Sequence, residues 1–184
     1  MWSMFSAILR PGVELRLLEE RHAAVLFALV DREREYLRQW MPWVDTRSSE
    51  DDILAFIRGA LELFAANNGF SAGIWADGSI AGVITLHKID WMNRKGEIGY
   101  WLAREFQGCG MMTDAVRAVT QHGLVELDLN RIEIQCSVVN TKSIAVPKRL
   151  GFSFEGILRE AQRLNERYVD LELYSMLRRE YRRP

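Results

Sequence analysis

One stretch of the sequence decides the fold, and it reads EIGYWLAREFQGCGMMTDA over residues 97–115. A predicted strand over 97–103 runs into a loop that holds Gly108 and Gly110, and this loop opens directly onto a helix. Glycine lets the backbone approach a ligand closely with its N–H groups pointing outward. The helix adds its unpaired N-terminal N–H groups and the positive end of its dipole. The stretch therefore predicts a site for phosphate or pyrophosphate.

A second block separates this interpretation from an ordinary strand-to-helix turn. The first block alone is neither a dinucleotide fingerprint, because Thr113 stands where the third glycine belongs, nor a P-loop, because no Lys-Ser/Thr follows. The second block reads CSVVNTKSIAVPKRLGF over residues 136–152. In it a strand ends at Asn140, a short helix carries Ser143, and Leu-Gly-Phe returns the chain to a strand. The two blocks together indicate a built ligand site.

The remaining periodicity predicts one α/β domain around these blocks. Strands are expected over 13–17, 70–76, 79–87, 97–103, 131–138, 152–160 and 168–177, and helices over 19–36, 48–67, 110–127 and 140–150. This order favours a mixed, largely antiparallel central sheet flanked by about four helices, not a doubly wound nucleotide fold. No Pro/Ser/Gly-rich linker divides the chain. We therefore expect a single domain over 1–184, with residues 1–11 as an N-terminal extension.

Composition and charge exclude several classes of protein. The 184 residues carry 24 Lys plus Arg against 25 Asp plus Glu, so the chain lacks the strongly basic face that duplex nucleic acid requires. Cys109 and Cys136 form neither a CxxC motif nor a zinc-ligand spacing, and no metal is expected. The apolar stretches are shorter than the roughly 18 residues of a membrane span. We expect a cytoplasmic protein that binds neither nucleic acid nor membranes.

Together the two blocks resemble the GCN5-related N-acetyltransferase (GNAT) superfamily. In that family an Arg/Gln-x-x-Gly-x-Gly/Ala loop holds the pyrophosphate of acetyl-CoA, and an Asn…Leu-Gly-Phe block follows downstream. Gln107 and Gly110 match the loop, whereas Met112 departs from its usual small last residue. Other segments are similar to the RimJ/RimL-type protein N-terminal acetyltransferases, namely LRQWMPW (37–43), NRKGEIGYW (93–101) and YVDLELY (168–174). The resemblance implies a GNAT-like fold and acetyl-CoA as co-substrate.

The resemblance also implies which residues bind acetyl-CoA. The pyrophosphate is assigned to the loop residues Gln107, Gly108, Cys109, Gly110, Met111 and Met112. The thioester carbonyl and the first pantetheine amide are assigned to the backbone N–H groups of Trp101, Leu102 and Ala103. Asn140 would position the pantetheine arm, although its chemistry suits a helix N-cap equally well.

Two residues are expected to carry the proton transfers. Many GNAT enzymes protonate the leaving thiolate with a tyrosine at the position that Pro147 occupies here. In RimJ/RimL-like members a serine three residues after the asparagine is thought to serve, which is Ser143; otherwise its hydroxyl is a helix cap or surface group. Glu97 is the candidate general base, directly or through a water. Its alternative role is a surface carboxylate paired with Arg94 or Lys95. Glu105 is a weaker candidate base.

The family implies a protein N-terminal amine, with ribosomal proteins as the substrate class. An α-amine has a pKa of about 7.7–8.0, so a mild base suffices, whereas a lysine amine near 10.4 demands more. A small amine (polyamine, amino sugar or amino acid) and a non-catalytic acyl-CoA-binding regulatory role stay open. We expect the acceptor cleft to be built from residues 36–48, 88–95 and 160–168, and a homodimer is compatible with the sequence.

Overall fold

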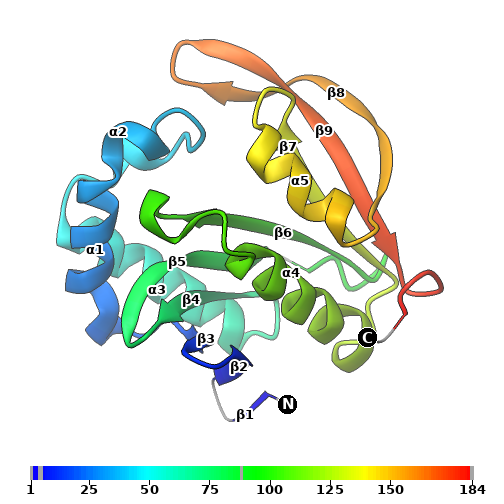
Figure 1. The fold of residues 1–184 in the computed structure, drawn as a ribbon, viewed down its shortest axis with the longest axis horizontal. Coiled ribbons are helices and arrows are strands. Elements are labelled where there is room, and N and C mark those ends of the chain that lie inside the picture. Colours follow the sequence, from blue (N-terminus) through cyan, green and yellow to red (C-terminus); the bar gives the residue numbers. More distant parts are fainter. Residues whose placement is uncertain (1, 4–5, 88, 183–184) are drawn as a thin grey trace.

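The computed structural model describes residues 2–3, 6–87 and 89–182, with side chains from residue 6 onward. Figure 1 shows one twisted, open sheet with helices packed on both faces. In chain order the strands are β1 (Trp2–Ser3), β2 (Ser6–Arg10), β3 (Val13–Leu17), β4 (Phe70–Ala76), β5 (Ser79–Leu86), β6 (Lys95–Leu102), β7 (Arg131–Ser137), β8 (Ser153–Leu164) and β9 (Arg167–Leu177). Their spatial order is β1-β2-β3-β4-β5-β6-β7-β9-β8.

Five α-helices accompany these strands in the described ranges. They are α1 (Ala23–Arg32), α2 (Arg34–Leu37), α3 (Glu50–Ala65), α4 (Met111–Gln121) and α5 (Thr141–Arg149). Single 3₁₀ turns cover Glu20–His22, Val44–Thr46 and Arg104–Phe106, and a π-helical turn over His122–Glu126 follows α4. None of the helices described is both long and apolar enough to cross a membrane.

The helices bury two apolar clusters, one on each face of the sheet. On one face Val119 of α4 and Ile144 of α5 belong to a cluster that includes Ile98 of β6. On the other face Leu26 of α1 and Val83 of β5 belong to a second cluster. Each fully buried side chain of this size contributes about 1.5–3 kcal/mol relative to an exposed one. Strand β5 therefore buries apolar side chains on both of its faces.

The predicted α/β class with a largely antiparallel sheet is confirmed, with one division that the periodicity does not show. The predicted helix over 19–36 is split into a 3₁₀ turn, α1 and α2. The break falls at Glu33, whose backbone is not helical (φ −97°, ψ 6°). The Glu33 carboxylate is buried and accepts hydrogen bonds from the backbone N–H and the Nε of Arg104 at 3.3 and 2.9 Å. A tertiary contact therefore ends α1.

Residues at the two ends of the chain extend the sheet further than the sequence predicts. Within the predicted extension 1–11, β1 and β2 pair antiparallel with each other, and β2 pairs with β3. Residues 1, 4 and 5 of that extension lie outside the described residues. At the opposite edge β8 and β9 form a long hairpin whose register shifts between Phe154 and Gly156 and again between Leu158 and Gln162. These irregularities bend the hairpin, as Figure 1 shows in orange and red.

Candidate active site

The sheet opens where β6 and β7 part. These two strands are the parallel pair of the sheet, and their ladder joins only Lys95–Glu97 to Arg131–Glu133. Beyond Glu97 the strands diverge, and a cleft of about 650 Å³ lies between the end of β6, the start of α4, α5 and residues 36–41. This volume is within the range of small-molecule sites. The gap exposes backbone that a continuous sheet would have paired.

The glycine loop forms one wall of this cleft. Gly108 and Gly110 both have φ of +82°, a left-handed conformation that other residues rarely adopt, and Gly110 directly precedes α4. Met111 and Met112 bury their side chains in the core, so mainly their backbone faces the cleft. Met112, although larger than the residue usual at this position, therefore does not crowd the cleft. The loop and helix start offer N–H groups suited to an anion.

Cys109 lies on the outer side of the same loop. Its side chain is exposed, and it is absent from the cleft lining. Its carbonyl oxygen accepts a hydrogen bond from Arg10 Nη1 at 2.9 Å, and Arg10 also pairs with Asp114 at 3.3 Å. Arg10 therefore holds the loop from behind. Any contribution of Cys109 to binding is through its backbone.

The Gln107 side chain links three walls of the cleft. Its Nε2 donates to the Tyr36 hydroxyl at 2.8 Å and to the Leu102 carbonyl at 2.9 Å. Its Oε1 accepts from Lys142 Nζ at 3.0 Å. Lys142 and Arg149 both line the cleft and supply positive charge. Gln107 thus fixes the loop beside two cations that suit phosphate groups.

The expected backbone donors need one correction. The Ala103 N–H donates to the Ala81 carbonyl at 2.9 Å, and Ala103 is fully buried outside the cleft lining, so its N–H is not free for a ligand. Backbone groups alternate in direction along an antiparallel ladder. Trp101 therefore also turns its N–H toward β5, whereas Tyr100 and Leu102 direct theirs into the gap beside β7. Spacing along the chain does not reveal this alternation until the strand pairing is known.

Ser143 lines the cleft and belongs to a small polar cluster. Its backbone N–H donates to Asn140 Oδ1 at 3.1 Å, so Asn140 caps α5 while also lining the cleft. Ser143 Oγ lies 3.3 Å from the Tyr100 hydroxyl and 3.2 Å from Cys136 Sγ. Burial raises the pKa of Tyr100 well above its usual range and raises the pKa of Cys136. Both groups are therefore protonated at neutral pH.

Glu97 lies on the opposite face of β6 and is not among the residues that line the cleft. Its Oε2 accepts from Gln135 Nε2 at 3.2 Å, and Arg94 pairs instead with Asp128. Burial, and secondly the nearby charge of Glu133, raise the pKa of the Glu97 carboxyl above its ordinary value. The expected pairing with Arg94 is thus not seen. A carboxyl with a raised pKa is better matched to taking a proton near neutral pH.

Neither Glu105 nor Pro147 is placed to take part in proton transfer within the cleft. Glu105 is exposed, forms an ion pair with Arg32 and is absent from the cleft lining. Pro147 lies inside α5 with a buried ring. The structure therefore leaves the two candidates named first, Ser143 and Glu97, on opposite faces of the same strand.

His87 is a neighbour of Glu97, and no motif in the sequence indicates a role for it. Its backbone N–H donates to the Glu97 carbonyl at 2.8 Å, which places the two side chains on one face of the sheet. A Cβ added to Gly99 would lie 2.4 Å from His87 Nε2, so the imidazole lies across Gly99. His87 as a whole is exposed, and desolvation of the imidazole by the surrounding protein lowers its pKa. Gly99 is the sequence signal for this close approach.

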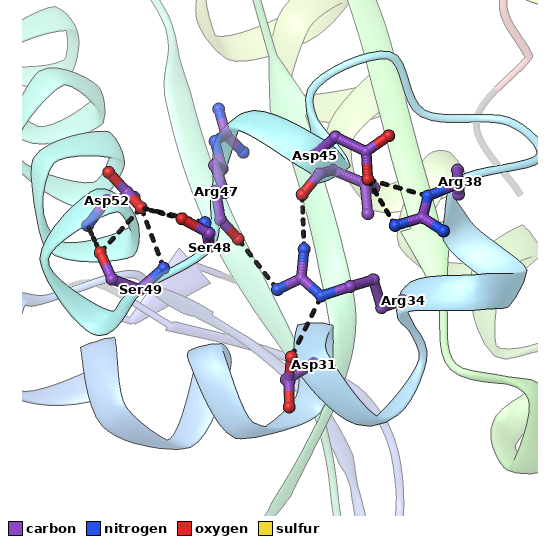
Figure 2. A network of polar contacts seen from close by, with 9 residues as sticks. Asp31, Arg34, Arg38, Asp45, Arg47, Ser48, Ser49 and Asp52 are labelled. Atoms are coloured by element: carbon purple, nitrogen blue, oxygen red, sulfur yellow. Dashed lines mark hydrogen bonds and ion pairs between the residues drawn. The ribbon is translucent and has the colours of Figure 1, made fainter. Parts of the chain in front are cut away.

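The segment between α2 and α3 forms the wall on this second face. Figure 2 shows how it is fixed: Arg34 donates to the carbonyls of Val44 and Arg47 at 2.6 and 3.0 Å and to Asp31 at 3.0 Å. Trp43 then packs against Trp101 with ring centroids 6.1 Å apart. Trp101 lines the cleft, so this wall is continuous with it.

Of the two other expected acceptor segments, 160–168 is described in full and 88–95 in part. At the β8–β9 turn, Asn165 Nδ2 lies 3.5 Å from the Arg38 carbonyl, which joins residues 160–168 to residues 36–48. Lys88, in the segment 88–95, lies outside the described residues. The contact across the turn brings two of the three predicted segments together.

Comparisons with known proteins identify the class. Residues 13–153 match the acetyltransferase (GNAT) domain family. The chain is 40% identical to a putative ribosomal N-acetyltransferase, YdaF, of Bacillus subtilis (strain 168), over 97% of this chain and 98% of that protein. It is 32% identical to the ribosomal-protein-serine acetyltransferase of Escherichia coli (strain K12), over 90% and 93%. A solved RimL structure in complex with coenzyme A superposes with a TM-score of 0.90 at 30% identity, covering 94% and 97%.

The divided sheet, the glycine loop suited to a phosphate and the matched family together define the class of the protein, an acyltransferase. The chain belongs to the GNAT acetyltransferase family. The family and the enzyme class predicted from the sequence are confirmed.

Proposed function

We propose that this acetyltransferase moves the acetyl group of acetyl-CoA to the α-amine of a protein N-terminus, with a ribosomal protein as acceptor. One observation carries the proposal: the cleft where β6 and β7 part is lined from both faces of the sheet, with donors and cations on one face. A carboxyl at the last residue of the β6–β7 ladder, with an imidazole next to it, lies on the other face. The two relatives described above, matched over nine-tenths or more of the chain, are named as ribosomal-protein acetyltransferases, which supports the acceptor class. A ribosomal-protein acceptor agrees with the cytoplasmic location predicted from the sequence.

The α4–α5 face suits the cofactor. The pyrophosphate is assigned to the N–H groups of residues 108–112, with Lys142 beside them, because the Gln107 N–H already donates to the Arg104 carbonyl. The pantetheine arm then lies along β6, where Leu102 and Tyr100 present backbone groups that β7 does not pair. An extended arm in this gap adds to the sheet as a further strand would. Trp101 is assigned to the cofactor site because it lines the cleft, and Asn140 because its side-chain amide also lines it.

The opposite face suits the amine. A protonated α-amine loses its proton to Glu97, directly or through a water, and the neutral nitrogen attacks the thioester carbonyl. The C–N bond forms, a tetrahedral oxyanion results, and the N–H groups of the gap stabilise it. The oxyanion then collapses, the C–S bond breaks, and the nitrogen releases its second proton to water. The thiolate takes a proton from the Ser143 hydroxyl, which regains one from water. Ser143 and Glu97 act from opposite faces, so neither blocks the other's substrate.

Mass spectrometry of acetylated peptides tests the proposal. The protein and acetyl-CoA are incubated with a peptide that carries a free α-amine and a lysine, and with the same peptide blocked at its α-amine. We expect one acetyl group on the first peptide, located at the N-terminus, and none on the second. Acetylation of lysine alone contradicts the proposed acceptor.

A parallel panel separates the alternatives. Spermidine, an amino sugar and a free amino acid replace the peptide, and thiol release reports turnover. Release with a small amine and none with peptides would indicate the small-molecule alternative. A thermal shift with acetyl-CoA but no turnover on any amine would favour the acyl-CoA-binding protein.

A further inference from the structure

Arg47 lies in an unusual environment on the acceptor-side wall. Its guanidinium carbon is 4.4 Å from the ring centroid of Trp43 and 4.1 Å from that of Phe56, so two aromatic rings contact the cation. The side chain is half-buried, and burial lowers its pKa. Aromatic faces stabilise a guanidinium, but they leave its five N–H donors without acceptors.

Three carboxylates of the network around Arg47 are already committed to other groups. Asp31 pairs with Arg34, Asp45 pairs with Arg38, and Asp52 accepts from Ser48 and Ser49 at the start of α3. Figure 2 shows the Arg47 carbonyl turned toward Arg34, while its guanidinium points away from this network. Within residues 6–87 and 89–182, the guanidinium forms no ion pair. A partly desolvated cation without an anion is costly unless a ligand supplies one.

Arg47 is also close to the site of transfer. Trp43 contacts Arg47 on one side and packs against Trp101, which lines the cleft, at 6.1 Å. A single indole ring thus separates the cation from the cleft wall. The two contacts of the Trp43 ring, at 4.4 Å to the guanidinium and 6.1 Å to the Trp101 ring, set an upper bound on the distance from Arg47 to Trp101, and an extended peptide of three residues, about 10 Å long, is comparable to that bound.

We propose that Arg47 is a carboxylate-binding subsite for the acceptor, and that the enzyme prefers N-terminal segments with Asp or Glu about three residues after the terminal amine. The fork of the guanidinium binds the carboxylate edge-on while its carbon stays over the Trp43 and Phe56 rings. This inference rests on the proposed acceptor class. The inference adds to the proposed function that the acceptor protein carries an acidic residue close to its N-terminus.

The test measures binding without turnover. Isothermal titration calorimetry gives the Kd of a short peptide with Asp at its third position, and of the same peptide with Asn there, for the protein saturated with CoA. We expect the Asp peptide to bind about tenfold more tightly, as one charge-assisted hydrogen-bonded pair implies. Arg47→Met keeps an apolar side chain between the rings and should abolish the preference. Arg47→Lys keeps the charge but not the fork and should retain part of it.

The matched control is Arg38→Met, which removes the same charge from the same wall at an arginine already paired with Asp45. It should leave the preference intact. Equal Kd values for the two peptides in the wild type, a preference that survives Arg47→Met, or its equal loss in Arg38→Met each overturn the subsite. If Arg47→Met does not fold, the wild-type preference should still shrink as salt rises; a salt-independent preference also overturns it. Peptides that bind but are never acetylated count against the proposed function, not against Arg47.

Discussion

The Tyr100 hydroxyl donates a 3.0 Å hydrogen bond to the backbone carbonyl of Ser143. In a regular α-helix that carbonyl accepts from the N–H of the residue four positions on. Here that residue is Pro147, which has no N–H. Tyr100, from β6, thus replaces the donor that α5 lacks. The proline that stands where many GNAT enzymes have a tyrosine therefore brings a different tyrosine hydroxyl into the same site.

This relationship predicts a coupling between Tyr100 and Pro147. Tyr100→Phe should destabilise the protein by about 1–3 kcal/mol, because the Ser143 carbonyl is left without a donor. In a Pro147→Ala background the restored helix N–H satisfies that carbonyl, so the same substitution should cost less than half as much. Urea denaturation of the four proteins gives the coupling. Equal costs in both backgrounds would show that Tyr100 does not replace the missing N–H.

A second prediction concerns Ser143. If its hydroxyl protonates the thiolate, Ser143→Ala should lower kcat by about 10²–10⁴-fold and leave the KM for acetyl-CoA nearly unchanged. Ser153→Ala, at an exposed position of β8, serves as the control and should have wild-type kcat. The measurement is kcat and kcat/KM against pH with one accepted amine, under conditions where chemistry limits the rate. Wild-type kcat at every pH would remove Ser143 as the acid and leave water or Tyr100.

The cofactor loop gives a third prediction with a close control. Gly110, Gly108 and Gly78 all have φ near +82°, but Gly78 lies in the β4–β5 turn away from the cleft. Alanine at either Gly110 or Gly78 should destabilise the protein by about 1–2 kcal/mol, because both need the left-handed region. Only Gly110→Ala should raise the KM for acetyl-CoA severalfold, since it tilts the N–H groups of the loop. Equal KM values in the two variants would place the phosphates elsewhere.

The local blocks of sequence carry most of what could be predicted. Residues close together in the sequence determine strand 97–103, the glycine loop and the helix after it. Asn140 and Ser143 likewise lie three residues apart at the start of one helix. These elements occur with shifts of one to a few residues at their ends. Local order is enough for such features, because propensity and capping act within a few residues.

The rest depends on contacts between distant segments. Which N–H groups are free on β6 follows from pairing with β5, so Ala103 could not be distinguished from Leu102 by position alone. Glu33 ends α1 through Arg104, seventy-one residues later in the chain. The contact between Arg47 and the Phe56 ring requires α3 to pack against the preceding loop. Each of these belongs to tertiary packing, which overrides local pattern.

The fourth prediction concerns Glu97, whose carboxyl touches Gln135 and is influenced by Glu133. Because the pKa of Glu97 is raised in the folded protein, the base protonates at a higher pH than an ordinary glutamate. The low-pH limb of kcat/KM should therefore follow Glu97, and Glu97→Gln should depress the rate most above the pKa of Glu97, where the wild-type carboxyl is ionised and the α-amine is still protonated. Ser153→Ala again provides a variant with an unchanged profile.

The same raised pKa fixes the sign of an effect of Glu97 on stability. The folded state binds the proton more tightly than the unfolded state, whose glutamate keeps its ordinary pKa of 4.5. Ionised Glu97 therefore costs stability above the folded pKa, and this cost disappears as the pH falls below 4.5. Glu97→Gln should accordingly have a higher Tm than wild type at pH 7, with the difference shrinking to zero near pH 4, where Glu97 is protonated in both states. Thermal unfolding at half-unit intervals between pH 4 and 8 measures it. A Glu97→Gln protein that is less stable at pH 7, or a Tm difference that does not change with pH, would show that Glu97 is ionised without penalty and is not poised as a base.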